Sequence, residues 1–84
     1  MRQKEIFGKI FWDKRERVED YTVTFIHRGA PGDQKTILCT SFVNVAKSWF
    51  TYRSDEEETL IPFHRILEIK NLKTGKVLWR KVLK

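Results

Sequence analysis

Residues 21–28, YTVTFIHR, alternate from one side chain to the next, and this alternation decides the fold class. One face of the segment would carry Tyr21, Val23, Phe25 and His27, and the other face would carry Thr22, Thr24, Ile26 and Arg28. A period of two, in a segment rich in aromatic and β-branched residues, predicts a β-strand. The next residues, GAPGDQK (29–35), predict a tight loop, because glycine tolerates the positive φ that such loops need.

The rest of the chain, followed outward from this strand, predicts one helix and further strands. Residues 2–13 place four apolar side chains at helical spacing (Ile6, Phe7, Ile10 and Phe11), which predicts an amphipathic helix of about three turns. The charged residues 13–20 predict a solvated connection. Strands are predicted at 46–53, at 59–63, and in a C-terminal hairpin of 64–72 and 76–83 around KTGK, with an acidic turn at 54–58.

Two segments are less definite. Residues 36–43, TILCTSFV, fit a strand or a loop with a short helical turn. Pro62 lacks an N–H group, so it must lie on an edge strand or at a bulge. Together the elements predict an α+β fold, in which the N-terminal amphipathic helix packs on a curled, mainly antiparallel sheet of about five strands.

Composition limits the classes of protein and partner. The 84 residues predict a single domain, 1–84, and 40% hydrophobic residues suffice for a core. Cys39 is the only cysteine, so no internal disulfide forms, and we expect a cytoplasmic protein with no membrane span and no cofactor. The net charge of +6 and the pI of about 9.7 favour a polyanionic partner, usually RNA or DNA.

Both histidines of the chain occur in His-Arg pairs, at residues 27–28 and 64–65. Alternation puts His27 on the apolar face of its strand. Counted from Phe63, alternation puts Arg65 on the apolar face with Ile69, and His64 on the other face. An arginine on a core face needs an anion or a carboxylate partner. If the pairs converge, two guanidinium forks and two imidazoles suit phosphate oxygens, and the glycine loop with Gly29 and Lys35 adds N–H groups and charge.

Other readings of the same residues stay open. His27 fits a hydrogen-bonding residue at the end of a strand, and Arg65 fits a buried ion pair. His27 and His64 also fit a general base and a general acid that cleave an RNA phosphodiester. The spacing of histidines and carboxylates predicts no metal site.

Aromatic residues among the basic ones suggest base stacking, at about 1 to 3 kcal/mol per base. Trp12, Trp49, Trp79, Phe50 and Tyr52 are the candidates, and Trp49 and Tyr52 are preferred. Phe50 and Trp79 fit the core better, whereas Trp49 and Tyr52 lie on opposite faces of one strand.

Four segments together resemble a family of small, mostly archaeal proteins, whose domain also occurs fused in larger eukaryotic proteins. They are YTVTFIHRGAPGDQKTI (21–37), SWFTY (48–52), IPFHRILEIKN (61–71) and GKVLWRK (75–81). The family is described as a predicted RNA cyclic-phosphate-end recognition domain. The resemblance implies a part in RNA processing or repair, with the family's motif on His27, Arg28, Gly29, His64 and Arg65.

Three hypotheses follow. The first is an RNA-binding module that recognises a phosphorylated or 2′,3′-cyclic-phosphate end. The second is a small phosphoesterase or nuclease that uses His27 and His64. The third is an interaction module for a protein partner, such as an RNA-processing protein. The sequence leaves the oligomeric state open.

Overall fold

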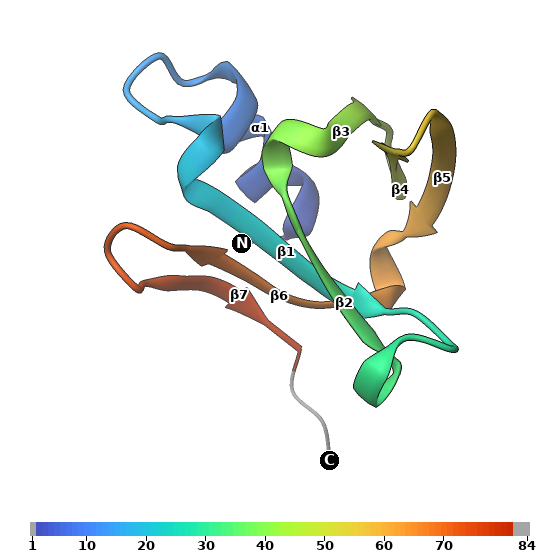
Figure 1. Cartoon of the computed structure of the whole chain (residues 1–84). Coiled ribbons are helices and arrows are strands. Elements are labelled where there is room, and N and C mark those ends of the chain that lie inside the picture. Colours follow the sequence, from blue (N-terminus) through green and yellow to red (C-terminus); the bar gives the residue numbers. More distant parts are fainter. Residues whose placement is uncertain (1, 82–84) are drawn as a thin grey trace.

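The computed structural model describes residues 2–81 and contains one α-helix and seven strands (Figure 1). The helix is α1 (Gln3–Trp12), and the strands are β1 (Tyr21–Ile26), β2 (Gln34–Leu38), β3 (Phe42–Val45), β4 (Trp49–Ser54), β5 (Glu57–Pro62), β6 (Ile66–Asn71) and β7 (Val77–Arg80). Four short 3₁₀ turns connect them: η1 (Val18–Asp20), η2 (Pro31–Asp33), η3 (Cys39–Ser41) and η4 (Phe63–Arg65). Within this part of the chain, no helix is long and apolar enough to cross a membrane.

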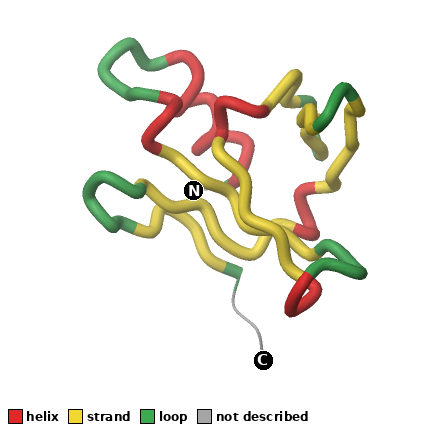
Figure 2. Tube along the Cα trace, in the orientation of Figure 1, coloured by secondary structure: helices red, strands yellow, loops and turns green. Residues whose placement is uncertain are grey.

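The strands form two antiparallel sheets, coloured yellow in Figure 2. One has four strands in the order β2-β1-β6-β7, and the other has three in the order β3-β4-β5. The α+β class is therefore confirmed, but the prediction of one curled sheet of about five strands is wrong. The 3₁₀ turns η3 and η4 are the reason, because each interrupts an extended run where the chain passes from one sheet to the other.

The alternation in β1 is reflected in its burial, with one exception. Tyr21, Val23 and Phe25 are buried on one face, but Thr22 on the other face is buried as well. The strand ends at Ile26, so His27 lies just beyond it. In residues 36–43 both readings hold, since β2 and β3 flank the helical turn η3. β6 and β7 form the predicted hairpin, with Ile69 opposite Trp79; its predicted last residues, 82 and 83, lie outside the described part.

The β4–β5 hairpin has a two-residue turn at Asp55 and Glu56, whose φ angles are 49° and 69°. Positive φ at both central positions is what a type I′ turn requires. Pro62 pairs with Trp49 at the end of β5, which is an edge strand. The predicted edge position of this proline is confirmed.

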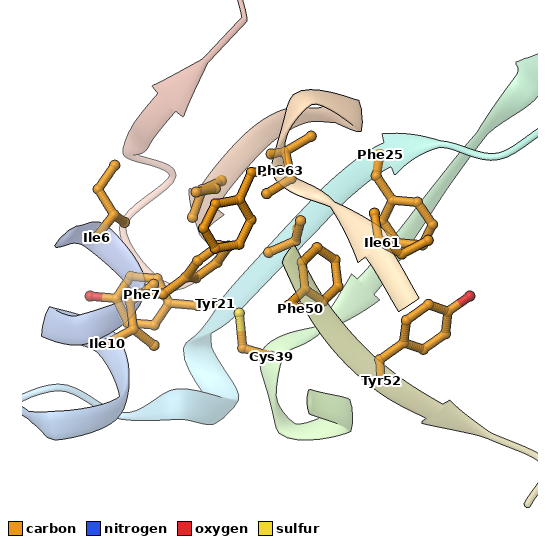
Figure 3. Packing of buried hydrophobic residues seen from close by; sticks show 13 residues of the cluster. Ile6, Phe7, Ile10, Tyr21, Phe25, Cys39, Phe50, Tyr52, Ile61 and Phe63 are labelled. Atoms are coloured by element: carbon orange, nitrogen blue, oxygen red, sulfur yellow. The ribbon is translucent and has the colours of Figure 1, made fainter. Parts of the chain in front are cut away.

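The core lies between the two sheets and α1, and phenylalanine rings fill much of it (Figure 3). Phe7 projects from α1 and its ring centroid lies 6.0 Å from that of Phe50 and 5.6 Å from that of Phe63. Phe50 stacks on Phe42 at 4.3 Å. Aromatic contacts at these distances stabilise a pair by about 0.5–1.5 kcal/mol beyond the area they bury.

The predicted helix is confirmed, and its apolar stripe joins it to both sheets. Ile6, Phe7 and Ile10 are buried, and the helix ends at Trp12; the N–H group of the next residue, Asp13, donates to the Lys9 carbonyl. At the start of the helix, Nε2 of Gln3 donates to the Phe63 carbonyl at 3.4 Å, which places this end of α1 beside η4.

Candidate functional site

The two His-Arg pairs lie at the same end of neighbouring strands. β1 and β6 are antiparallel, and Phe25 of β1 pairs with Ile66 of β6. His27 follows Phe25 by two residues and His64 precedes Ile66 by two, so both pairs leave this end of the ladder. In Figure 1 the end of β1 and the start of β6 meet at the right of the molecule. The expected convergence of the pairs agrees with this register.

The outer strands bring further positive charge to the same end. β2 starts here, because Gln34 pairs with Ile26, and Lys35 follows it. β7 finishes here, because Arg80 pairs with Glu68 and the Lys81 N–H group donates to the Leu67 carbonyl at 2.9 Å. We call this region the basic end and define it by its cationic and imidazole side chains: His27, Arg28, Lys35, His64, Arg65, Arg80 and Lys81.

The first pair, His27 and Arg28, belongs to a loop whose conformation is stabilised by backbone hydrogen bonds. The His27 N–H group donates to the Asp33 carbonyl and the Asp33 N–H group to the Ala30 carbonyl, both at 2.9 Å. Gly29 (φ 93°) and Gly32 (φ 67°) supply the positive φ that the sequence predicted. Between the loop and β2 lies a shallow concavity of about 550 Å³, which His27, Arg28 and Lys35 help to line. Its lining combines positive side chains with the glycine-containing backbone.

The second pair lies on the 3₁₀ turn η4, and both of its side chains are exposed. The prediction that Arg65 faces the core is wrong. Strand alternation does not extend through a helical turn, so Ile66 and Ile69 take the buried positions instead. The alternative role of Arg65 in a buried ion pair is wrong for the same reason. Nζ of Lys81 donates to the His64 carbonyl at 2.8 Å and so ties β7 to this turn.

Charge at the basic end is only partly neutralised. Among the described residues, Arg28, Lys35 and Arg65 take part in no ion pair. Arg80 does, since its guanidinium lies 2.9 Å from Glu68. Oδ1 of Asp33, the carboxylate of the loop, accepts the Gly29 N–H group at 3.4 Å. Two forked guanidinium groups and one ammonium group thus remain available to an anion.

The imidazole rings are similarly unengaged. Within residues 2–81 neither ring makes a hydrogen bond, and no group of three His, Cys, Asp or Glu side chains gathers as a metal site. The backbone of His27 is hydrogen bonded, as a residue at the end of a strand would be, and its ring meets Phe25 edge-on at 6.2 Å. Both rings can therefore donate to a ligand without first losing a partner.

The two preferred stacking residues differ in burial. Tyr52 is 2% exposed and packs in the core against Phe25, so the prediction that it stacks on a base is wrong. Nζ of Lys35 lies 5.5 Å from the centre of its ring, within the range of a cation–π contact. Trp49, at the start of β4, is half-buried and keeps part of its surface. The core position of Phe50 is confirmed, and Trp79 packs against the core.

Arg80 and Lys81 of the basic end were not among the predicted site residues, although the basic C-terminal segment WRKVLK (79–84) that contains them is compatible with a phosphate backbone. The predicted C-terminal hairpin already contained the signal. Antiparallel pairing brings the last residues of the hairpin back to its first residues, which are His64 and Arg65.

The model of the MJ1316 RNA cyclic group end recognition domain matches residues 1–81 of the chain. A UPF0248 protein of Methanococcus vannielii is 42% identical over 79 residues, which cover 94% of this chain and 90% of the relative. One of Methanocaldococcus jannaschii is 42% identical over 78 residues (93% and 91%), and one of Thermococcus kodakarensis is 41% identical over 76 (90% and 86%). No solved structure gives a significant match.

Proposed function

This chain belongs to the family of the MJ1316 RNA cyclic group end recognition domain, and from that membership we propose that it binds RNA ends that carry a phosphate or a 2′,3′-cyclic phosphate. The observation that carries the proposal is the basic end, where both His-Arg pairs leave the same end of the β1–β6 ladder. The terminal phosphate would lie there. Binding, rather than reaction, is the activity we assign.

The chemistry of the side chains supports a phosphate ligand. A guanidinium presents parallel N–H donors that match two phosphate oxygens, and Arg28 and Arg65 each offer such a fork. His27 and His64 add N–H donors, and Lys35 adds a charge. Gly29 lies in the loop beside Arg28, where its small size lets an oxygen approach the backbone closely.

We infer that the protein acts in RNA processing or repair, in the cytoplasm, with RNA as its partner. Ends of this kind arise when an RNA strand is cut and must be recognised before they are joined or trimmed. Because we assign binding and not reaction to this chain, another protein would have to join or trim the end. That RNA-processing protein would be a second partner.

The deciding experiment compares one short RNA in three forms, ending in a 2′,3′-cyclic phosphate, a 3′-phosphate or a 3′-hydroxyl. Affinity is measured by fluorescence anisotropy, and the RNA is afterwards analysed by chromatography for a changed end. We expect tighter binding of the phosphorylated forms and recovery of the RNA unaltered. Turnover that is lost in both His27→Ala and His64→Ala would instead establish an enzyme. If the affinity for all three RNA forms is equally negligible at moderate salt, the protein does not bind RNA ends, and the remaining hypothesis is a protein-interaction module.

A further inference from the structure

A groove outside the basic end runs between α1 and the edge strand β3. Its volume is about 510 Å³, and its walls include four aromatic side chains, Phe7, Phe11, Trp12 and Phe42. Lys4 and Asn44 are the polar side chains of the lining, which contains no carboxylate.

Trp12 is the strongest sign that the groove has an occupant. It is 86% exposed, whereas the apolar stripe of α1 buries Ile6, Phe7 and Ile10. Two residues beyond Ile10, Trp12 projects away from the core face of the helix. Val43, which is 48% exposed, lines the same groove, and a contiguous exposed apolar surface of this kind marks an interaction site.

Gly8 gives a second, independent sign. It lies inside α1 and lines the groove, yet a Cβ atom at this position would meet no atom within 4 Å. Packing within the chain therefore does not require glycine here, and an alanine would favour the helix. A glycine facing an open groove instead lets a ligand approach the helix backbone.

The groove also begins close to the basic end. Gln3, at the start of α1, donates to the carbonyl of Phe63, the first residue of the turn that carries His64 and Arg65. Lys4 is the next residue of the helix. From Lys4 to Trp12 the helix rises about 12 Å, at about 1.5 Å per residue. That length holds about three stacked bases, at about 3.4 Å each.

We infer that this groove binds the unpaired bases that precede the RNA end, so that the substrate is a single-stranded end rather than a blunt duplex. Trp12 stacks on a base, Asn44 faces a base edge with its amide, and Lys4 meets a backbone phosphate. The positive charge of Lys4, without a carboxylate in the lining, suits a phosphate backbone, and the start of the groove beside η4 connects it to the proposed end-binding site. The inference rests on the proposed function, whose end-binding site it extends.

The test measures the affinity of the Trp12→Ala variant for a single-stranded RNA of a few nucleotides with a cyclic-phosphate end, and for a blunt duplex with the same end. We expect binding of the single strand to weaken by about 5- to 140-fold and binding of the duplex to stay unchanged. Trp12→Phe should restore most of the loss, because phenylalanine keeps a stacking ring. Leu72→Ala is the matched control, since Leu72 is also apolar and exposed (55%) but lies in the β6–β7 loop.

The outcomes separate this inference from the proposed function. If the Trp12→Ala variant binds the single strand as tightly as the parent protein, the groove does not bind the unpaired bases. This holds even if the variant still prefers the cyclic-phosphate end. A shift from dimer to monomer in sedimentation of the RNA-free variant would also overturn it, because the groove would then join two copies of the chain. Conversely, equal affinity for cyclic-phosphate and hydroxyl ends, with a large Trp12→Ala effect, would keep the groove and reject end recognition.

Discussion

Arg28 and Arg65 differ from the other exposed basic residues in shape rather than in charge. Each presents a planar fork at the end of a ladder that carries a histidine next to it. Lysine keeps the charge but offers a single compact ammonium group, so the substitution of arginine by lysine isolates the effect of the fork. Both side chains are exposed, and therefore the substitutions should leave the core intact.

We predict that Arg28→Lys and Arg65→Lys each lower the ratio of affinities for the cyclic-phosphate and hydroxyl forms of one RNA by about 3- to 30-fold, as expected when a charge-assisted bidentate contact is lost. Lys73→Ala, in the β6–β7 loop at the other end of the sheet, should weaken both forms slightly and leave the ratio unchanged. If neither arginine variant changes the ratio, the His-Arg pairs do not recognise the end.

Cys39 provides a test of the core that needs no ligand. Burial raises the pKa of its thiol from 9.0 to about 12. Folding thus favours the protonated thiol. The stability gained in this way is present below the ordinary pKa of 9.0 and is lost as the pH rises through the folded value of about 12.

We predict that iodoacetamide alkylates Cys39 roughly a hundredfold to a thousandfold more slowly in the native protein than in denaturing guanidinium, because a shift of this size leaves about a thousandfold less thiolate. Mass spectrometry at mildly alkaline pH gives both rates. Similar rates in the two states would contradict the buried position of the thiol.

The directions of the side chains were harder to predict than their places along the chain. The predicted meeting of the two His-Arg pairs agrees with the register of β1 and β6, and it stays a prediction. The predicted direction of the Arg65 side chain was wrong. Arg65 lies in the 3₁₀ turn η4, where the side chains do not alternate between two faces as they do in a strand. Tyr52 shares the buried face of β4 with Phe50, and a strand pattern alone does not say which face meets the core.

Among the elements, short helical turns determine the architecture. η3 separates β2 from β3, and η4 separates β5 from β6, and the members of each couple belong to different sheets. Three-residue turns leave no hydrophobic period in a sequence, so the prediction of one curled sheet could not detect them. Longer features such as α1 and the β6–β7 hairpin were predicted correctly because their periods extend over many residues.

The β4–β5 turn offers a prediction about stability. Asp55 and Glu56 both have positive φ, which asparagine and aspartate tolerate and glycine adopts freely, but which is unfavourable for glutamate. We predict that the double substitution Asp55→Asn with Glu56→Gly raises the free energy of unfolding by about 1 kcal/mol, which corresponds to a rise in Tm of about 4–8 °C for a domain of this size.

Gly75→Ala is a control substitution that should lower the free energy of unfolding instead of raising it. Gly75 has a φ of 76° and space for a Cβ atom, so alanine there adds backbone strain without a clash. Its Tm should fall. A turn variant that is less stable than the parent protein would show that the side chains of Asp55 and Glu56 compensate for their backbone.

In the whole molecule, the larger sheet gathers basic residues at one of its ends. All four strands of the larger sheet deliver a basic residue to one end: Arg28 after β1, Lys35 in β2, Arg65 before β6 and Arg80 with Lys81 at the end of β7. Antiparallel pairing produces this gathering from segments that lie far apart in the sequence. These five of the 17 Lys and Arg residues create a positive field at this end of the sheet, which attracts a polyanion.

Binding of RNA at this end should release counterions, and the salt dependence of the affinity counts the contacts. We predict about two to five phosphate contacts, so that log K plotted against log salt concentration falls with a slope of roughly −1.4 to −3.5 on single strands. Removing one charge from the basic end, in Lys35→Met, should make the slope shallower by about 0.7, whereas Lys73→Met should change it little. Anisotropy titrations over a series of salt concentrations give the slopes. A flat salt response would contradict an electrostatic interface, and an equal change in both variants would place the RNA along the whole sheet rather than at its basic end.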